Sequence, residues 1–138
     1  MKKNQLTIRT ILMFVFFTTL ISSCKDEKAK TAGDVEPPIL TVFKPDASDI
    51  FAAGDTIYLS AHVEDISQMQ DFTVTLIYSD TLLLWPEVPG ILGNLTEYDL
   101  NDWSINTLGV NESAIIRFEA SDKHDNITIV DIPVQLEI

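Results

Sequence analysis

The chain has 138 residues, of which 21 are acidic and 9 are basic, so its formal net charge at pH 7 is −12. Such a charge repels phosphate backbones and argues against a nucleic-acid partner. The single cysteine, Cys24, excludes a disulfide within one copy of the chain.

The N-terminal 23 residues have the layout of a secretory signal. Lys2, Lys3 and Arg9 precede an uncharged run at 11–21, and no acidic residue occurs before Asp26. A basic start, a short apolar stretch and small residues after it are typical of a signal peptide that is removed. The alternative is an uncleaved N-terminal anchor, but the run has only about half the length that a spanning helix needs.

The stretch ISSC at 21–24 resembles a bacterial lipobox, in which an aliphatic residue and two small residues precede a cysteine. The resemblance implies cleavage before Cys24 and acylation of that residue, and two or more acyl chains anchor a protein durably. The following Lys-Asp-Glu at 25–27 resembles the acidic tag of Bacteroidetes-type surface lipoproteins. That tag implies an outer-membrane protein on the cell surface, with the periplasmic leaflet as the alternative.

The mature chain divides into a tether and one domain. We expect a signal peptide at 1–23, a lipidated cysteine with a flexible tether at 24–35, and a domain at 36–138 that begins at two prolines. Removal of the signal takes away three basic residues and no acid, so the mature chain keeps six bases against 21 acids and has a net charge of −15. About 100 residues suffice for one small core.

Apolar residues in the domain recur with a period of two, which is typical of strands with one buried face. The alternation is clear at 54–65, 71–80, 113–122 and 128–138, and weaker at 39–44 and 102–106. Phe118 is expected in the core, and Pro133 faces outward and indicates an edge or a bulge. The turn signals between these runs predict an all-β, antiparallel Greek-key sandwich of about seven strands.

The spacing of several residues resembles bacterial immunoglobulin-like modules. The matching segments are PPI at 37–39, Phe51 with GDTI at 54–57, AxVxD at 61–65 and AxDxxxN at 120–126. The resemblance implies an immunoglobulin-like domain that binds or spaces rather than catalyses. The chain departs from the pattern in its long apolar middle, and at Asp125, where such modules carry glycine.

Acidic residues in the turns form a candidate calcium site. The sandwich topology would bring the loop after the second strand and the last hairpin to one end, and calcium takes six to eight oxygen ligands. The candidate ligands are Glu36, Glu64, Asp65, Asp122 and Asp125. The alternative is a set of solvated acids that cap turns locally.

Three aromatic residues near the middle segment are candidate ligand-binding residues: Trp85, Tyr98 and Trp103. Exposed aromatics stack on sugars, whereas buried ones fill cores, and an immunoglobulin-like core usually buries one tryptophan, for which Trp85 is placed best. The two histidines, His62 and His124, are expected to be solvated, and too few further nitrogen or sulfur ligands exist for zinc.

No catalytic constellation stands out in the sequence, so we expect a binding protein rather than an enzyme. The expected function is that of a surface lipoprotein whose domain binds a glycan or a partner protein of the outer membrane. The alternative is a structural accessory subunit without a small-molecule ligand. The triplets at 55–57 and 80–82 also resemble acceptor sites for bacterial O-glycosylation.

Lipidation of Cys24 can be tested in cells. An alkyne-modified fatty acid should label the wild-type protein and should not label Cys24→Ala, because the thiol is the acceptor of the acyl chains. In-gel fluorescence after cycloaddition measures the label, and equal labelling of both proteins would contradict lipidation at this residue.

Overall fold

The computed structural model describes residues 33–85 and 92–138. One compact unit spans Asp34–Ile138, and the predicted signal, Cys24 and most of the tether lie outside the described residues. No helix in the described part is long and apolar enough to cross a membrane. Eight strands make up the described domain: β1 (Ile39–Lys44), β2 (Ile50–Ala52), β3 (Thr56–Glu64), β4 (Met69–Tyr78), β5 (Thr81–Leu84), β6 (Glu97–Ile105), β7 (Glu112–Asp122) and β8 (Ile127–Glu137).

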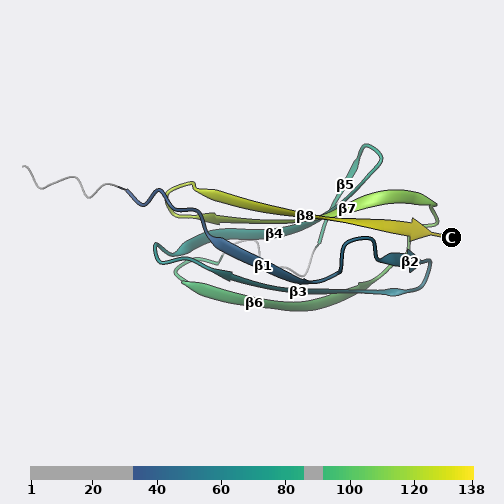
Figure 1. The fold of residues 1–138 in the computed structure, drawn as a ribbon, viewed down its shortest axis with the longest axis horizontal. Helices are drawn as coiled ribbons and strands as arrows, with labels where there is room; N and C mark the ends of the chain where they lie inside the picture. The colour runs from purple at the N-terminus through teal and green to yellow at the C-terminus, as the bar shows by residue number, and fades with distance from the viewer. Residues whose placement is uncertain (1–32, 86–91) are drawn as a thin grey trace, which may run out of the picture. The chain divides into compact units, whose positions relative to one another are not determined.

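The strands form two sheets, ordered β1-β3-β6 and β2-β8-β7-β4-β5, which face each other as a sandwich (Figure 1). The chain changes sheet between β1 and β2, between β2 and β3, between β3 and β4, between β5 and β6, and between β6 and β7. These crossings are those of an immunoglobulin-like Greek-key sandwich. The predicted all-β fold is therefore confirmed, with eight strands instead of about seven and with one parallel pairing, β2 with β8.

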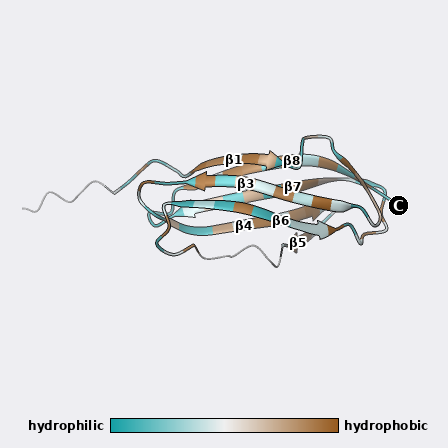
Figure 2. Cartoon of the chain, turned by 90° about the horizontal axis from the view of Figure 1, so that it is seen from below, coloured by the Kyte–Doolittle hydropathy of each residue, from teal (hydrophilic) through white to brown (hydrophobic). Residues whose placement is uncertain are grey.

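The core lies between the sheets and consists of the inner positions of the alternating strands. The largest fully buried side chains include Phe72, Phe118, Ile57 and Leu59. Along β3 and β7 every second residue is buried, and Figure 2 shows apolar and polar residues alternating along these strands. Burial of the apolar set fixes the register, since a slip by one residue would turn that set toward water.

Two strands and part of a third were not expected from the sequence. Strand β2 has only three residues, and the apolar sequence of β5 does not alternate. Strand β6 begins at Glu97, five residues before the expected start. The inner positions of its second half carry Asp102 and Ser104 instead of apolar residues, while Trp103 and Ile105 are exposed, so the hydrophobic alternation is inverted there.

The neighbours of β8 explain why a proline is tolerated at position 133. Pro133 pairs with Ile115 of β7 on one side, and β2 covers only residues Gln135 to Glu137 on the other side. At Pro133 the free side of β8 receives only a hydrogen bond from the Ser48 amide, 2.7 Å from the proline carbonyl. The missing N–H of proline therefore costs no ladder bond.

Phe118→Ala should destabilise the domain by about 3–5 kcal/mol, because this fully buried ring leaves a cavity when it is removed. Phe43→Ala is the matched control: the Phe43 side chain is 55% exposed, so its loss should cost about 1 kcal/mol or less. Urea unfolding followed by circular dichroism measures both values. Equal stability of the two variants would show that the register of β7 is wrong.

Candidate binding face

The outer face of the three-stranded sheet is set by the pairing of β3 with β6. Nine consecutive residue pairs join these strands without a bulge, from Thr56–Ile105 to Glu64–Glu97. Because Ile57, Leu59 and Val63 point into the core, the residues between them point outward. The outer face of β3 and β6 is therefore as regular as the core beneath it.

Tyr58 and Trp103 lie directly opposite each other on this face. Their side chains are 62% and 57% exposed. Residues opposite each other in an antiparallel pair have Cβ atoms about 5 Å apart, so the two aromatic side chains rise side by side from the sheet. They form an exposed aromatic pair on the outer surface of the sheet.

Polar pairs continue the face beyond the aromatic pair. In the next cross-strand row the Ser60 hydroxyl donates to Oδ1 of Asn101 at 3.2 Å. In the row after that, Nδ1 of His62 lies 2.7 Å from a carboxylate oxygen of Asp99. The last row holds two glutamates, Glu64 and Glu97. Strand β1 borders these rows with Lys44, Thr41 and Ile39, opposite Ser60, His62 and Glu64.

The His62–Asp99 pair is an ion pair when the imidazole is protonated. The hydrogen bond to Asp99 raises the pKa of His62 above its ordinary value near 6.5, against a smaller opposing effect of desolvation, and the charges of Glu64 and Glu97 add to the increase. The sequence led us to expect a solvated histidine, because the partner is 37 residues away in the chain. The Ser60 hydroxyl, in the neighbouring row, donates to Asn101 rather than to this histidine.

The three predicted aromatic ligand-binding residues do not lie together. Trp85 is only 7% exposed and belongs to the core cluster, where it lines a small apolar hollow of about 210 Å³ beside β5. The Tyr98 ring packs against Phe72 with a centroid distance of 5.8 Å, and burial, followed by the charge of Asp102, raises the pKa of Tyr98. For Trp85 the structure shows the core position for which the sequence placed it best, and Tyr98 packs against Phe72. Of the three candidate ligand-binding residues, Trp103 is exposed.

Tyr58 is the residue of the aromatic pair that sequence reasoning missed as a binding candidate. Its outward position follows from the alternation of β3, which the sequence predicts. Its proximity to Trp103 does not follow, because that depends on the pairing of β3 with β6, two strands with two others between them in the chain.

The predicted calcium ligands are divided between two places. Glu36, Glu64 and Asp65 line an open hollow of about 600 Å³, together with Asp34 and Glu97. No three of the five predicted residues have carboxylate oxygens within 4.8 Å of one another. Among the residues that the structure describes, the group whose ligand atoms do converge within 4.8 Å is Asp34, Asp122 and His124. The predicted five-residue set is therefore not a single coordination sphere.

Asp122 is committed to hydrogen bonds within the last turn. Although it is fully buried, its carboxylate accepts from the backbone N–H groups of His124 and Asn126, at 2.7 and 2.8 Å. The Asn126 side-chain amide donates to it as well, at 2.7 Å. With the Ser67 hydroxyl at 3.2 Å as a fourth donor, the chain itself supplies partners for about all four acceptor positions of the carboxylate. Calcium binding at this end of the domain stays a prediction.

Hydrogen bonds also connect the last turn to the loop after β3 and to the start of the domain. The Ser67 hydroxyl lies 2.5 Å from Asp65 and 3.2 Å from Asp122, so it links the loop after β3 to the last turn. The Asn126 amide donates to the backbone carbonyl of Asp34 at 3.0 Å. Asp125, which is exposed and has a φ of 64°, occupies the left-handed position of the turn, a conformation that Asp and Asn tolerate.

No protein-family model matches the chain, and no curated protein matches it. Among solved structures, the chain is similar to the fibronectin(III)-like modules of Clostridium thermocellum CbhA, with 18% identity and a TM-score of 0.46 over 72% of this chain and 96% of that chain. It is also similar to a Niemann-Pick type C2 protein from the Japanese carpenter ant, with 12% identity and a TM-score of 0.45 over 74% of this chain and 94% of that chain. These similarities concern the β-sandwich fold alone.

Asp122→Asn should destabilise the domain by about 2–4 kcal/mol, because it removes a charged acceptor of several hydrogen bonds. Burial alone would raise the pKa of Asp122, but the hydrogen bonds from Asn126, His124 and Ser67 outweigh it and hold the pKa below 3.8. The carboxylate of the wild type therefore stabilises the fold above about pH 4, and this contribution is lost as the pH falls through the lowered pKa.

Urea unfolding of wild type and variant at pH 7 and at pH 3 measures both effects, and the difference between the proteins should shrink at the lower pH. Asp125→Asn is the matched control, since it removes the same charge from the same turn at an exposed position. A loss of stability as large in the control as in Asp122→Asn would contradict the role assigned to Asp122.

Proposed function

We propose that the protein is a lipid-anchored surface lipoprotein whose immunoglobulin-like domain binds a glycan through Tyr58 and Trp103. The observation that carries this proposal is the exposed aromatic pair on the outer face of the β3–β6 sheet. Two large aromatic residues that are paired across strands and exposed to water leave apolar surface uncovered, and contiguous apolar surface marks interaction sites. Ring faces of this kind stack on the C–H faces of sugars.

The surroundings of the pair favour a glycan ligand. Directly beside the rings, Ser60 and Asn101 offer a hydroxyl and an amide on the same face. Binding sites combine an apolar surface with a few polar groups that orient the ligand. The residues lie on the outer face of a sheet, and an open face suits a polymer chain better than a small molecule that needs an enclosing cavity.

The proposed location rests on the sequence alone. Acylation at Cys24 would hold the protein in the outer membrane, and the Lys-Asp-Glu segment at 25–27 favours the cell surface over the periplasmic leaflet. Ten tether residues, 25–34, would span at most about 35 Å. We propose a binding role rather than an enzymatic one, because the His62–Asp99 pair lies on the outer face of the sheet.

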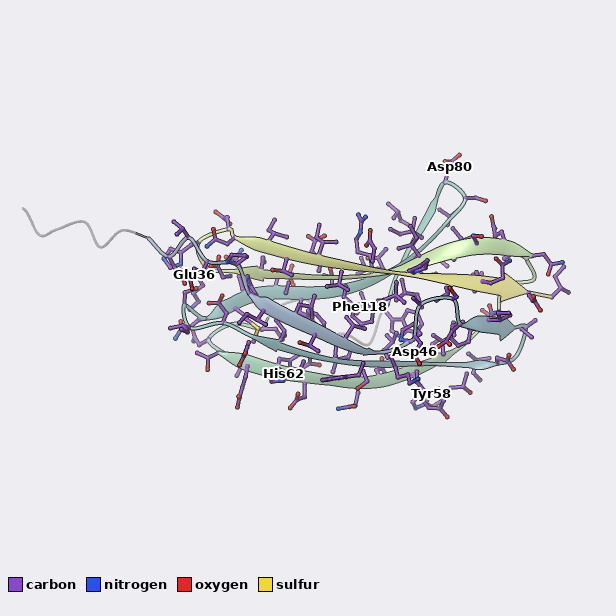
Figure 3. The ribbon with its side chains drawn as sticks, in the orientation of Figure 1. Glu36, Asp46, Tyr58, His62, Asp80 and Phe118 are labelled. Carbon is purple, nitrogen blue, oxygen red and sulfur yellow. The ribbon has the colours of Figure 1, made fainter. Side chains whose placement is uncertain are left out.

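A second candidate function is that of a structural accessory subunit that docks on an outer-membrane protein. An aliphatic row crosses the outer face of the five-stranded sheet, and its members pair in the order Leu82, Ile77, Ile115 and Pro133. Leu82 is 69% exposed and lies in the β4–β5 hairpin, which projects from the sheet with Asp80 at its tip (Figures 1 and 3).

Trp103→Ala separates the two functions. It should weaken binding to a recognised polysaccharide by about tenfold or more, which corresponds to ~1.4 kcal/mol, because it removes one ring of the stacking surface. Affinity electrophoresis in gels that contain soluble polysaccharides measures this loss. Leu82→Ala is the control, because it removes exposed apolar area from the other sheet and should leave glycan binding unchanged.

The glycan proposal fails if no polysaccharide retards the wild-type protein, or if Trp103→Ala migrates as the wild type does in every gel. If Trp103→Ala migrates as the wild type does and Leu82→Ala no longer binds an outer-membrane protein that the wild type binds, the accessory function is favoured.

A further inference from the structure

The face of β3 and β6 is a ladder of four cross-strand rows that changes in chemistry from one end to the other. It runs from Tyr58–Trp103 through Ser60–Asn101 and His62–Asp99 to Glu64–Glu97. At about 3.3 Å per residue, the first and last rows lie ~20 Å apart. Figure 3 shows Tyr58 and His62 projecting from the same side of this sheet. The ladder is long enough for an oligosaccharide that contacts both ends.

The end of the ladder away from the aromatic pair is strongly acidic. Glu64 and Glu97 face each other directly, and Asp99 lies one row away. Like charges placed directly opposite each other destabilise an antiparallel strand pair, so this arrangement works against the stability of the sheet. A cationic ligand would relieve that repulsion.

Within the described residues, the positive side chains near the ladder leave a surplus of carboxylates. His62 is hydrogen-bonded to Asp99 through Nδ1, and its other ring nitrogen, Nε2, lies 3.9 Å from Glu64. Lys44 borders the ladder opposite Ser60, but its ammonium is paired with Asp46. Even a protonated His62 supplies one positive charge against the three carboxylates of Glu64, Glu97 and Asp99, so the ladder keeps a net negative charge.

The ladder carboxylates are distributed over successive rows, which suits a ligand with several separate positive charges rather than one metal ion. Within the described ranges, the group whose oxygens and nitrogens converge within 4.8 Å is Asp34, Asp122 and His124, and it includes none of the three ladder acids. Separate carboxylates in successive rows suit a ligand whose charges recur along a chain. The open hollow beyond Glu64 and Glu97 adds Asp34, Glu36 and Asp65 in the same direction.

We propose that the ligand of this face is an amine-bearing glycan: a sugar ring stacks on Tyr58 and Trp103, Asn101 bonds a hydroxyl group, and Glu64, Glu97 and Asp99 hold protonated amines. The inference rests on the proposed glycan-binding function and specifies its ligand class. A basic peptide would also satisfy the acidic rows, and its cationic side chains can stack on aromatic rings, so oligolysine is the probe for that alternative.

The test compares oligosaccharides of equal length and linkage. They are an oligomer of glucosamine with free amines, its N-acetylated counterpart, and an oligomer of glucose; oligolysine serves as a purely cationic probe. The protein is the mature chain with Cys24→Ser, which stays free of acyl chains. Binding is followed by protection of Trp103 from acrylamide quenching, at one pH at which the sugar amines are protonated.

The free-amine oligomer should bind at least tenfold more tightly than either neutral oligomer at low salt, and the difference should fall as salt screens the charges. Glu64→Gln with Glu97→Gln should abolish the preference and keep the weaker binding of the neutral oligomers. Glu119→Gln with Glu137→Gln removes the same charge from the other sheet and should change neither. Trp103→Ala, followed by calorimetry, should weaken binding of all three sugars.

Three outcomes would overturn the inference. Equal affinity for the three oligosaccharides would remove the amine specificity and leave glycan binding by the aromatic pair intact. Oligolysine binding as tight as that of the free-amine oligomer, and unchanged in Trp103→Ala, would reduce the recognition to charge alone. Binding of none of the sugars would contradict both the inference and the proposed function.

Discussion

The uninterrupted pairing of β3 with β6 is the constraint on which the surface of this domain depends. The inner residues of β3, such as Ile57, Leu59 and Val63, are almost completely buried, and their burial allows only one register of the strand relative to the core. The nine-pair ladder then transfers that register to β6. As a result, the hydrophobic core determines which side chains of a distant strand stand beside Tyr58.

The strands whose alternation follows the core could be predicted from the sequence, and this alternation sufficed for the fold class. Strand β6 could not be predicted well, because its outward positions carry Trp103 and Ile105 while Asp102 lies inside. One carboxylate oxygen of Asp102 is buried without a hydrogen-bond partner in the described part of the chain, and burial of this kind is costly. Hydropathy alone would place Trp103 inside, so only the three-dimensional pairing reveals that it faces water.

The position of the acidic turn residues could be predicted from the sequence, but their hydrogen bonds could not. Sequence reasoning brought Asp65 and Asp122 to one end of the sandwich, and the Ser67 hydroxyl does link them there. It could not predict that amide donors of Asn126 and His124 would satisfy Asp122 from within its own turn. Hydrogen-bond geometry decides whether a carboxylate is bonded within its own turn or is available as a ligand for a cation. Residue type and spacing do not encode that geometry.

The measurement that tests this account most directly is the register of β3 against β6 in solution. Backbone nuclear Overhauser contacts should join Tyr58 to Trp103 and Ser60 to Asn101. Contacts from Tyr58 to Asp102 or Ser104 instead would mean a slip by one residue. Such a slip would turn Trp103 toward the core, and the exposed aromatic pair would not exist.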